Sequence, residues 1–187
     1  MAEHKQKKQE KTKRNEEIKA TLVGDKISSN SKQAMETYSS QRFGEKTGEK
    51  IYYTLSEALY LVEQNKMEIY DFRNKKISKK QIYEKFQRID KRFKIKYIVF
   101  RDLRHRGYIV KTALKFGAEF RVYEKGKEIG KHHAKWILYP VSESDILTWH
   151  EFSAKNRVAH STNKKLLIAI VDEENDVSYY EVGWKRP

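Results

Sequence analysis

Apolar residues in the first half of the chain recur at the spacing of amphipathic helices in two segments. Leu55, Leu59 and Val62 occupy positions i, i+4 and i+7, which lie on one face of a helix. Residues 82–89 carry a second stripe of the same kind. Each stripe follows a capping-box pattern, with Thr54 before Glu57 and Ser78 before Gln81. The sequence therefore predicts two helices, which begin after residues 54 and 78.

Shorter apolar runs around these helices predict strands. Residues 20–23 form one run, which ends at Gly24, and residues 67–72 form another. Between them, residues 28–50 are rich in Ser, Gly and Lys and contain few apolar residues, so this region is predicted to form short strands and turns. We expect a compact unit of strands and two helices that ends near residue 90.

A strand pattern in the second half places a tyrosine away from the apolar face. A helix with apolar spacing over residues 93–101, stopped by Gly107, comes first. Residues 118–123 then alternate, so that Phe120 and Val122 face one side of a strand while Arg121 and Tyr123 face the other. Tyr123 therefore need not belong to the core.

Four further elements complete the second half. Residues 136–141 are predicted to form a strand that ends near Pro140, and residues 147–161 a helix. The continuous apolar run 166–171 suits a central strand buried on both faces, and residues 177–184 form a last strand. The predicted fold class is α+β, with a mixed sheet flanked by helices in the second half.

We therefore expect three parts in the chain: a flexible basic tail over residues 1–18, a small N-terminal αβ domain over residues 19–90, and a C-terminal domain over residues 91–187. The tail is almost wholly polar, so it cannot bury enough apolar surface to offset the entropy of ordering it. Plain disorder and a contact with RNA are both open interpretations of this tail.

Charge changes the picture by pointing to a polyanionic partner. The 187 residues include 40 Lys and Arg against 26 Asp and Glu, a formal net charge of +14. Such an excess favours nucleic acid or an anionic membrane surface. No stretch approaches the ~20 apolar residues of a membrane span, and the first residues lack the apolar core of a signal peptide, so a cytoplasmic protein is expected.

The amino-acid composition gives little reason to expect a cofactor. Cysteine is absent, which excludes disulfides, thiolate metal sites and a cysteine nucleophile. The six histidines have no metal-binding spacing that we recognise, so neither a metal nor another cofactor is expected.

A metal-free nuclease needs a general base, a general acid and a cation that stabilises the charged phosphoryl oxygens. Tyr123, His133 and Lys164 could fill these roles if their strands are neighbours, because each lies at a strand end. From the residues alone, Tyr123 is as well explained as a half-buried aromatic. The adjacent residues His132 and Lys165 are alternatives to His133 and Lys164 for the same roles.

Three stretches of the second half resemble archaeal tRNA-splicing endonucleases, in the family's order and spacing. They are RDLRHRGYIVKTALKFGAEFRVYEKG (101–126), HHAKWILYPV (132–141) and RVAHSTNKKLLIAIVD (157–172). The earlier stretch TLSEALYLVEQNKMEIYDF (54–72) resembles the N-terminal domain of the same family.

The resemblance implies an endonuclease that removes introns from precursor tRNA at bulge-helix-bulge sites. The products would carry a 2′,3′-cyclic phosphate and a 5′-hydroxyl, and no metal would take part. Tyr123 falls on the family's general base, His133 on its general acid, and Lys164 on the lysine that stabilises the transition state. Thr162 and Asn163 stand where many relatives have Val-Arg or Val-Ser, which leaves Lys165 open as an alternative.

The resemblance also implies substrate-binding and assembly residues. Arg157 and Trp184 would hold a flipped bulge base between them, and Glu143 and Asp145 lie where an acidic loop would dock on another subunit. A homotetramer built as a dimer of dimers is expected, with a heterotetramer containing a structural paralogue as the alternative. The rival functions are a non-catalytic RNA-binding or structural subunit and a generic DNA-binding module.

Overall fold

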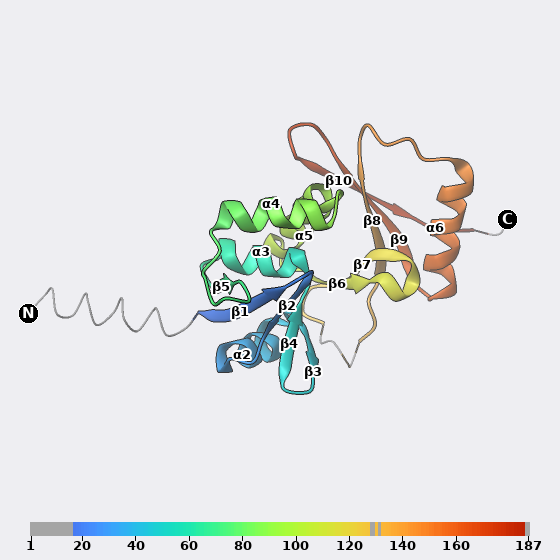
Figure 1. Ribbon diagram of the computed structural model, residues 1–187. Coiled ribbons are helices and arrows are strands. Elements are labelled where there is room, and N and C mark those ends of the chain that lie inside the picture. Colours follow the sequence, from blue (N-terminus) through green and yellow to red (C-terminus); the bar gives the residue numbers. More distant parts are fainter. Residues whose placement is uncertain (1–16, 128–129, 131, 186–187) are drawn as a thin grey trace, which may run out of the picture. The chain divides into compact units, whose positions relative to one another are not determined.

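The computed structural model describes residues 17–127, 130 and 132–185, and the chain divides into two compact units between Lys91 and Arg92 (Figure 1). Most of the tail predicted over residues 1–18 lies outside the described residues. Its last member, Ile18, is buried and already belongs to the first strand.

The first unit contains a five-stranded sheet among its described residues, in the order β3-β4-β2-β1-β5. Its strands are β1 (Ile18–Val23), β2 (Lys26–Ser29), β3 (Glu45–Thr47), β4 (Lys50–Tyr53) and β5 (Met67–Tyr70). Neighbouring strands are antiparallel, except that β5 runs parallel to β1. Its helices are α2 (Lys32–Gln41), α3 (Leu55–Glu63) and α4 (Lys79–Ile89).

The two capping boxes predicted from the sequence are confirmed. Thr54 accepts a hydrogen bond from the backbone of Glu57, whose carboxylate in turn accepts from the Thr54 backbone. Ser78 and Gln81 make the same exchange at the start of α4. The Glu57 carboxylate is buried and also accepts a hydrogen bond from the Gly44 backbone at 3.0 Å, so it links the start of α3 to the β3–β4 region.

The prediction that residues 28–50 form only short strands and turns is wrong for residues 32–41, which form α2. Ser31 caps this helix by accepting a hydrogen bond from the Ala34 backbone. Ala34 is the one described residue of α2 that is fully buried. With so thin an apolar face, the helix leaves almost no periodic signal in the sequence.

The second unit contains a five-stranded sheet in the order β10-β9-β8-β7-β6 among its described residues. Its strands are β6 (Ile109–Ala113), β7 (Ala118–Tyr123), β8 (Trp136–Ser142), β9 (Lys165–Val171) and β10 (Val177–Val182). Only the β8–β9 pair is parallel. The helices are α5 (Phe93–His105), the short 3-10 helix η1 (Leu114–Phe116) and α6 (Trp149–Ser161).

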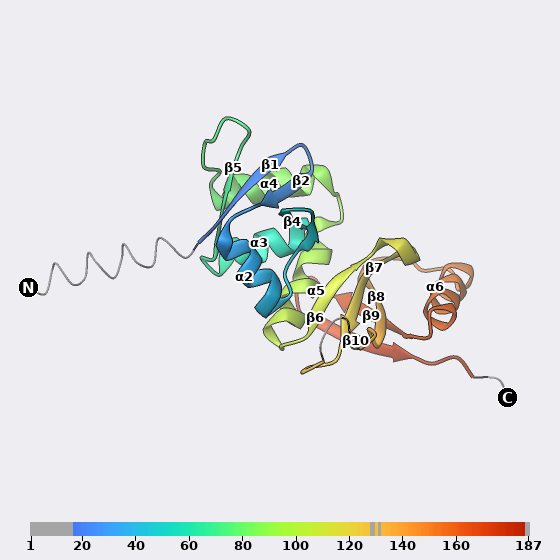
Figure 2. The same ribbon diagram turned by 90° about the horizontal axis from the view of Figure 1, so that it is seen from below.

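Helices α5 and α6 cover opposite faces of this sheet (Figure 2). On one face, the Phe120 ring lies 6.0 Å from the ring of Phe100 on α5. On the other face, Ile137 and Leu166 pack with Ala159 of α6. Because Ile137 pairs with Arg121 in register, the Arg121 side chain belongs to the α6 face.

The prediction that the β8 strand ends near Pro140 is wrong, since β8 continues to Ser142. Pro140 is tolerated in this interior strand because β7 pairs with β8 only as far as Leu138. The missing N–H of Pro140 therefore breaks no hydrogen bond on that side. No helix among the described residues is long and apolar enough to cross a membrane.

Candidate active site

Three strand ends meet at one end of the second sheet. The backbone N–H of Lys135, just before β8, donates to the carbonyl of Val122 at 3.0 Å. The N–H of Lys165, the first residue of β9, donates to the carbonyl of Lys135 at 2.9 Å. Tyr123 ends β7, Lys164 directly precedes β9, and His133 lies two residues before Lys135. The three residues predicted from the sequence therefore all lie within two residues of this junction.

Tyr123 lies on the α6 face of β7, opposite Phe120 and Val122, as predicted. Its side chain is nevertheless almost wholly buried, with 4% of its surface exposed. The Arg121 guanidinium carbon lies 6.0 Å from the centre of the Tyr123 ring. The ring is therefore buried on the same face of the sheet as a cationic side chain.

Lys164 lies where α6 ends and β9 begins. Asn163, with a φ of 54°, turns the chain out of the helix, a conformation that Asn tolerates well. The Lys164 ammonium donates to the carbonyl of Thr162 at 2.7 Å and lies 5.5 Å from the centre of the Phe116 ring. Burial, together with the positive charge of Arg121, lowers the pKa of Lys164.

The Lys165 side chain has different partners from that of Lys164. It pairs in register with Trp136 and forms an ion pair with Glu181 on β10. The same Glu181 carboxylate accepts a hydrogen bond from the Trp136 indole at 2.7 Å. Lys165 therefore belongs to a cross-strand network, whereas Lys164 lies beside Arg121.

Both candidate histidines are exposed, so exposure does not distinguish His132 from His133. Their segment, which connects β7 to β8, is anchored at its end by the buried Ala134 and by the Lys135 backbone. Lys135 also forms an ion pair with Glu124 at 2.5 Å across this connection.

Arg157 and Trp184, predicted as a base clamp, line the same pocket. The pocket has a volume of about 510 Å³, and its remaining walls are Phe152, Ser153, Asn156, His160 and Ser161. Arg157 is exposed on α6, and the Trp184 ring, half of whose surface is exposed, meets the His160 ring edge-on at 4.5 Å. The fold thus brings a guanidinium and an indole to one cavity from separate parts of the chain.

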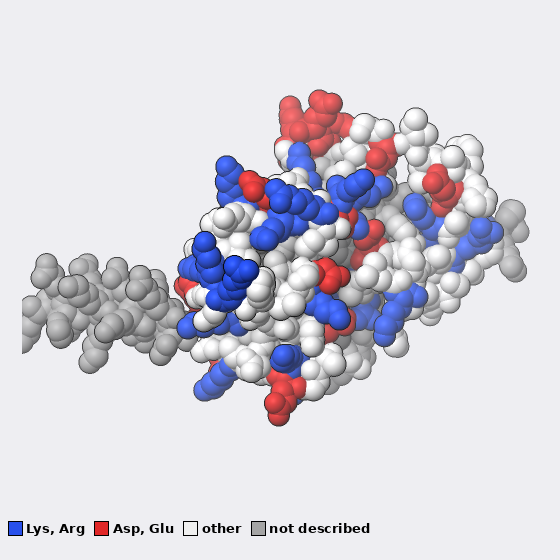
Figure 3. Space-filling view, viewed as in Figure 1, with Lys and Arg blue, Asp and Glu red and all other residues white. Residues whose placement is uncertain are grey.

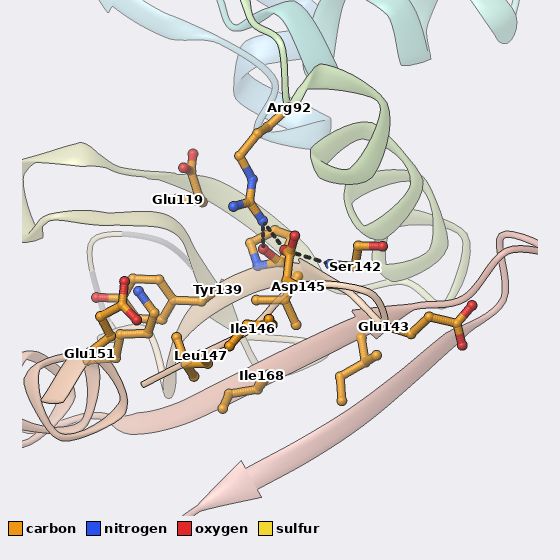
Figure 4. Close-up of a pocket in the computed structure, with 14 residues that line it drawn as sticks. Arg92, Glu119, Tyr139, Ser142, Glu143, Asp145, Ile146, Leu147, Glu151 and Ile168 are labelled. Atoms are coloured by element: carbon orange, nitrogen blue, oxygen red, sulfur yellow. Dashed lines mark hydrogen bonds and ion pairs between the residues drawn. The ribbon is translucent and has the colours of Figure 1, made fainter. Parts of the chain in front are cut away.

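Glu143 and Asp145, predicted to dock on another subunit, have partners within their own chain. The Asp145 carboxylate accepts hydrogen bonds from Arg92 at 2.8 Å and from the Ser142 backbone at 2.9 Å (Figure 4). Glu143 accepts one from the Glu173 backbone at 2.7 Å. The pocket in Figure 4, about 510 Å³ in volume, contains none of the three predicted catalytic residues.

A denser group of acidic residues lies at the turn between β9 and β10. Asp172, Glu173, Glu174 and Asp176 occupy this turn, and Figure 3 shows them as an acidic projection from the second unit. The sequence predicted an acidic turn here.

Arg121 is a candidate functional residue that the sequence reasoning missed. Its Nε is buried and has no hydrogen-bond acceptor among the described residues. It pairs in register with the buried Lys111 of β6, so two cationic side chains share this part of the α6 face. The sequence did contain a signal for Arg121, because the alternation of residues 118–123 places it on the same strand face as Tyr123.

The part of the chain that the structure describes contains no group of three or more His, Asp or Glu side chains placed to hold a metal ion. The candidate site contains a buried phenol, two exposed imidazoles, a half-buried ammonium and a guanidinium.

Comparison with known proteins assigns both units. Residues 18–83 match the N-terminal domain of tRNA intron endonucleases, and residues 93–179 match the catalytic C-terminal domain of the same family. The chain is 41% identical to a tRNA-splicing endonuclease of Pyrococcus abyssi over 168 residues, which cover 89% of this chain and 96% of the relative.

Two other archaeal relatives support the same family assignment. The chain is 40% identical to a tRNA-splicing endonuclease of Thermococcus onnurineus, over 91% of this chain and 98% of the relative. It is 46% identical to one of Nanoarchaeum equitans, over 71% of this chain and 88% of the relative.

Proposed function

Because the chain belongs to the tRNA intron endonuclease family and is a tRNA-splicing endonuclease that removes introns from precursor tRNA, we propose that Tyr123, His133 and Lys164 cut the RNA without a metal ion. The meeting of three strand ends, with Tyr123 and Lys164 on one face of the sheet, is the observation that carries this proposal. The substrate is cut at bulge-helix-bulge sites.

The reaction is an in-line transfer within the RNA strand. Tyr123, as its phenolate, takes the proton of the 2′-hydroxyl, and the 2′-oxygen forms a bond to phosphorus. The bond from phosphorus to the 5′-oxygen breaks, and His133 gives this oxygen a proton. The products are a 2′,3′-cyclic phosphate and a 5′-hydroxyl. Lys164 stabilises the negative charge that develops on the non-bridging oxygens. Electrostatic stabilisation of this kind is usually the largest single contribution to catalysis.

The choice of Lys164 over Lys165 is supported by their partners. Lys165 is engaged by Glu181, while the ammonium of Lys164 lies near Arg121, the neighbour of Tyr123 on β7. A carboxylate partner would offset the charge that the phosphate needs. For the acid, His133 is the histidine whose motif matches the family, and His132 stays the alternative.

Arg157 and Trp184 form the proposed base clamp, supplied by a subunit other than the one that cuts. Their shared pocket supports this role, because a base stacked between a guanidinium and an indole gains roughly 1–3 kcal/mol. Phe152 in the same pocket adds apolar surface for the base.

The proposed assembly is a homotetramer, a dimer of dimers. β10 is an edge strand of its sheet, and an unpaired edge is a template for a second copy. Exposed apolar side chains in the same unit, Ile146, Trp149 and Tyr180, offer further surface for self-association. Glu143 and Asp145 remain the predicted docking residues, and the acidic turn of Asp172–Asp176 is a second candidate. A cytoplasmic location stays a prediction.

One assay tests the cutting mechanism. The purified chain alone is incubated with an intron-containing precursor tRNA in EDTA, and the ends of the products are analysed. Cleavage with cyclic phosphate ends is expected for the unmutated chain. Lys164→Ala should lose this activity and the matched control Lys165→Ala should retain it. Strict dependence on added Mg²⁺ would contradict the metal-free mechanism, and inactivity of a well-folded chain would favour the non-catalytic subunit.

A further inference from the structure

The α6 face of the second sheet concentrates positive charge around Tyr123. Arg121 lies two residues before Tyr123 on the same strand face, and Lys111 lies opposite Arg121 on β6. Lys164 faces this group from the end of α6, and its pKa is lowered by burial and by Arg121.

The Arg121 guanidinium is held in a position that its own hydrogen bonds do not explain. Its Nε is buried, yet no described residue accepts a hydrogen bond from it. A buried donor without an acceptor destabilises the fold. The guanidinium lies over the Tyr123 ring, with 6.0 Å between its central carbon and the centre of the ring.

We propose that Arg121 is a positioning residue of the cleavage site, whose guanidinium orients the Tyr123 ring and keeps a surplus of positive charge beside Lys164 that the scissile phosphate neutralises. This inference rests on the proposed roles of Tyr123 and Lys164. It adds a residue for which the family resemblance implied no role.

The charge of Arg121 has a definite effect on the pH dependence of cleavage. Arginine stays protonated throughout the working pH range, so its repulsion of Lys164 is constant. Lys164 must be protonated to stabilise the phosphoryl oxygens, so the rate falls as the pH rises through the pKa of Lys164. Removing the charge of Arg121 raises that pKa, and the alkaline fall in rate moves to higher pH.

Other titratable groups lie on the elements around Lys164 and must be followed in the same experiment. They are Lys111 on β6, Lys115 on η1, Glu119 and Tyr123 on β7, His133 and Lys135 before β8, and His160 on α6. Lys164→Arg identifies the contribution of Lys164, because an arginine at that position keeps its proton and should abolish the alkaline fall.

The test measures single-turnover cleavage of precursor tRNA at subsaturating enzyme across a range of pH, a condition that reports the ionisation of the free enzyme. Arg121→Gln is expected to cut about 10- to 100-fold more slowly at neutral pH, because Tyr123 loses its alignment. Its alkaline fall should move to higher pH. Arg121→Lys should also be slow, since an ammonium does not stack as a guanidinium does, but its alkaline fall should stay near that of the unmutated chain.

The chain offers a matched control in Arg101, whose guanidinium carbon lies 5.8 Å from the ring centre of Tyr97 on α5. Arg101→Gln removes the same kind of contact outside the site and should leave the rate and pH profile unchanged. An Arg121→Gln protein that cuts at the normal rate, or cuts slowly with an unmoved alkaline fall, overturns the proposal. If Arg121→Gln does not fold, Arg121→Lys decides: a normal rate at neutral pH overturns the proposal.

A second measurement does not depend on cleavage. Inorganic phosphate at low salt should raise the melting temperature of the unmutated chain and of Arg101→Gln, because binding to the folded state alone stabilises it. The rise should be lost in Arg121→Gln. An equal rise in all three proteins would overturn the inference even where cleavage stands. Failure of the unmutated chain to cleave would instead contradict the proposed function.

Discussion

Two adjacent imidazoles precede β8, and only one of them can face the departing 5′-oxygen. We expect His133→Ala to lower the single-turnover cleavage rate by about 10²–10⁴-fold, the usual contribution of a general acid. His132→Ala should cost far less. Both histidines are exposed, so neither substitution removes a buried side chain. Rates for the two variants side by side check this, and equal losses would show that the roles are wrongly assigned.

The proposed base clamp makes a separate prediction, because neither Arg157 nor Trp184 is assigned a role in proton transfer. Arg157→Ala should slow cleavage at saturating enzyme by misplacing the scissile phosphate, and Arg157→Lys should rescue it poorly. Trp184→Phe should retain more activity than Trp184→Ala, since a phenyl ring still stacks. Normal cleavage by both Trp184 variants would place that residue in the core or a subunit contact.

At the scale of single residues, the sequence could predict which residue types the candidate site contains but not what surrounds each of them. It left Lys164 and Lys165 as alternatives, because adjacent lysines before a strand look alike until strand register gives each a partner. Register pairs Lys165 with Trp136 and brings Lys164 near Arg121. The burial of Tyr123 also could not be predicted from the sequence, since it depends on elements distant in the chain.

Among the described glycines of the first unit, Gly44 has the least room for an added side chain. Gly44 has a φ of 74°, and an added Cβ would lie 2.9 Å from the Tyr52 carbonyl and closer still to the buried Ile51. Its N–H also donates to the Glu57 carboxylate. Gly44→Ala should therefore cost about 3 kcal/mol of stability, from the left-handed backbone and the clash together.

Gly24 supplies the matched control for that substitution. It has a similar φ of 62°, but nothing lies within 4 Å of an added Cβ. Gly24→Ala should cost only about 1 kcal/mol, the backbone contribution alone. Thermal unfolding of the two variants gives the comparison, and equal losses would mean that the Gly44 region relaxes around the new methyl group.

Elements with strong local signals were predicted well, and those governed by tertiary contacts were not. The capping boxes of α3 and α4 contain their own start signals, so the sequence was sufficient. Helix α2 buries only Ala34 fully among its described residues, and its helical state therefore depends on Ser31 and on contacts with β1 and β4. The passage of β8 through Pro140 likewise depends on where its neighbour β7 stops pairing.

For the whole molecule, assembly is tested by reversing the charge of two acidic groups in turn. Glu143→Lys with Asp145→Lys should weaken the proposed tetramer to dimers and lower activity if that loop docks on another subunit. Glu173→Lys with Glu174→Lys makes the same test of the acidic turn. We expect the second pair to dissociate the tetramer further, because Glu143 and Asp145 already accept hydrogen bonds within their own chain.

Light scattering and cleavage rates on both double variants check this expectation. Asp145→Asn serves as a control, since it weakens the contact with Arg92 without reversing the charge. Intact tetramers with normal cleavage from both double variants would refute acidic docking altogether.

The parallel pairing of β8 with β9 also sets the order in which the enzyme becomes active as it is made. Parallel neighbours need a long crossover, here α6, so the segment carrying Lys164 leaves the ribosome well after Tyr123 and His133. A nascent chain that ends before β9 has the proposed base and acid but no cation to stabilise the charged phosphate. If Lys164 has the proposed role, nuclease activity is withheld until nearly the whole polypeptide has emerged, and incomplete chains pose little hazard to the RNA around them.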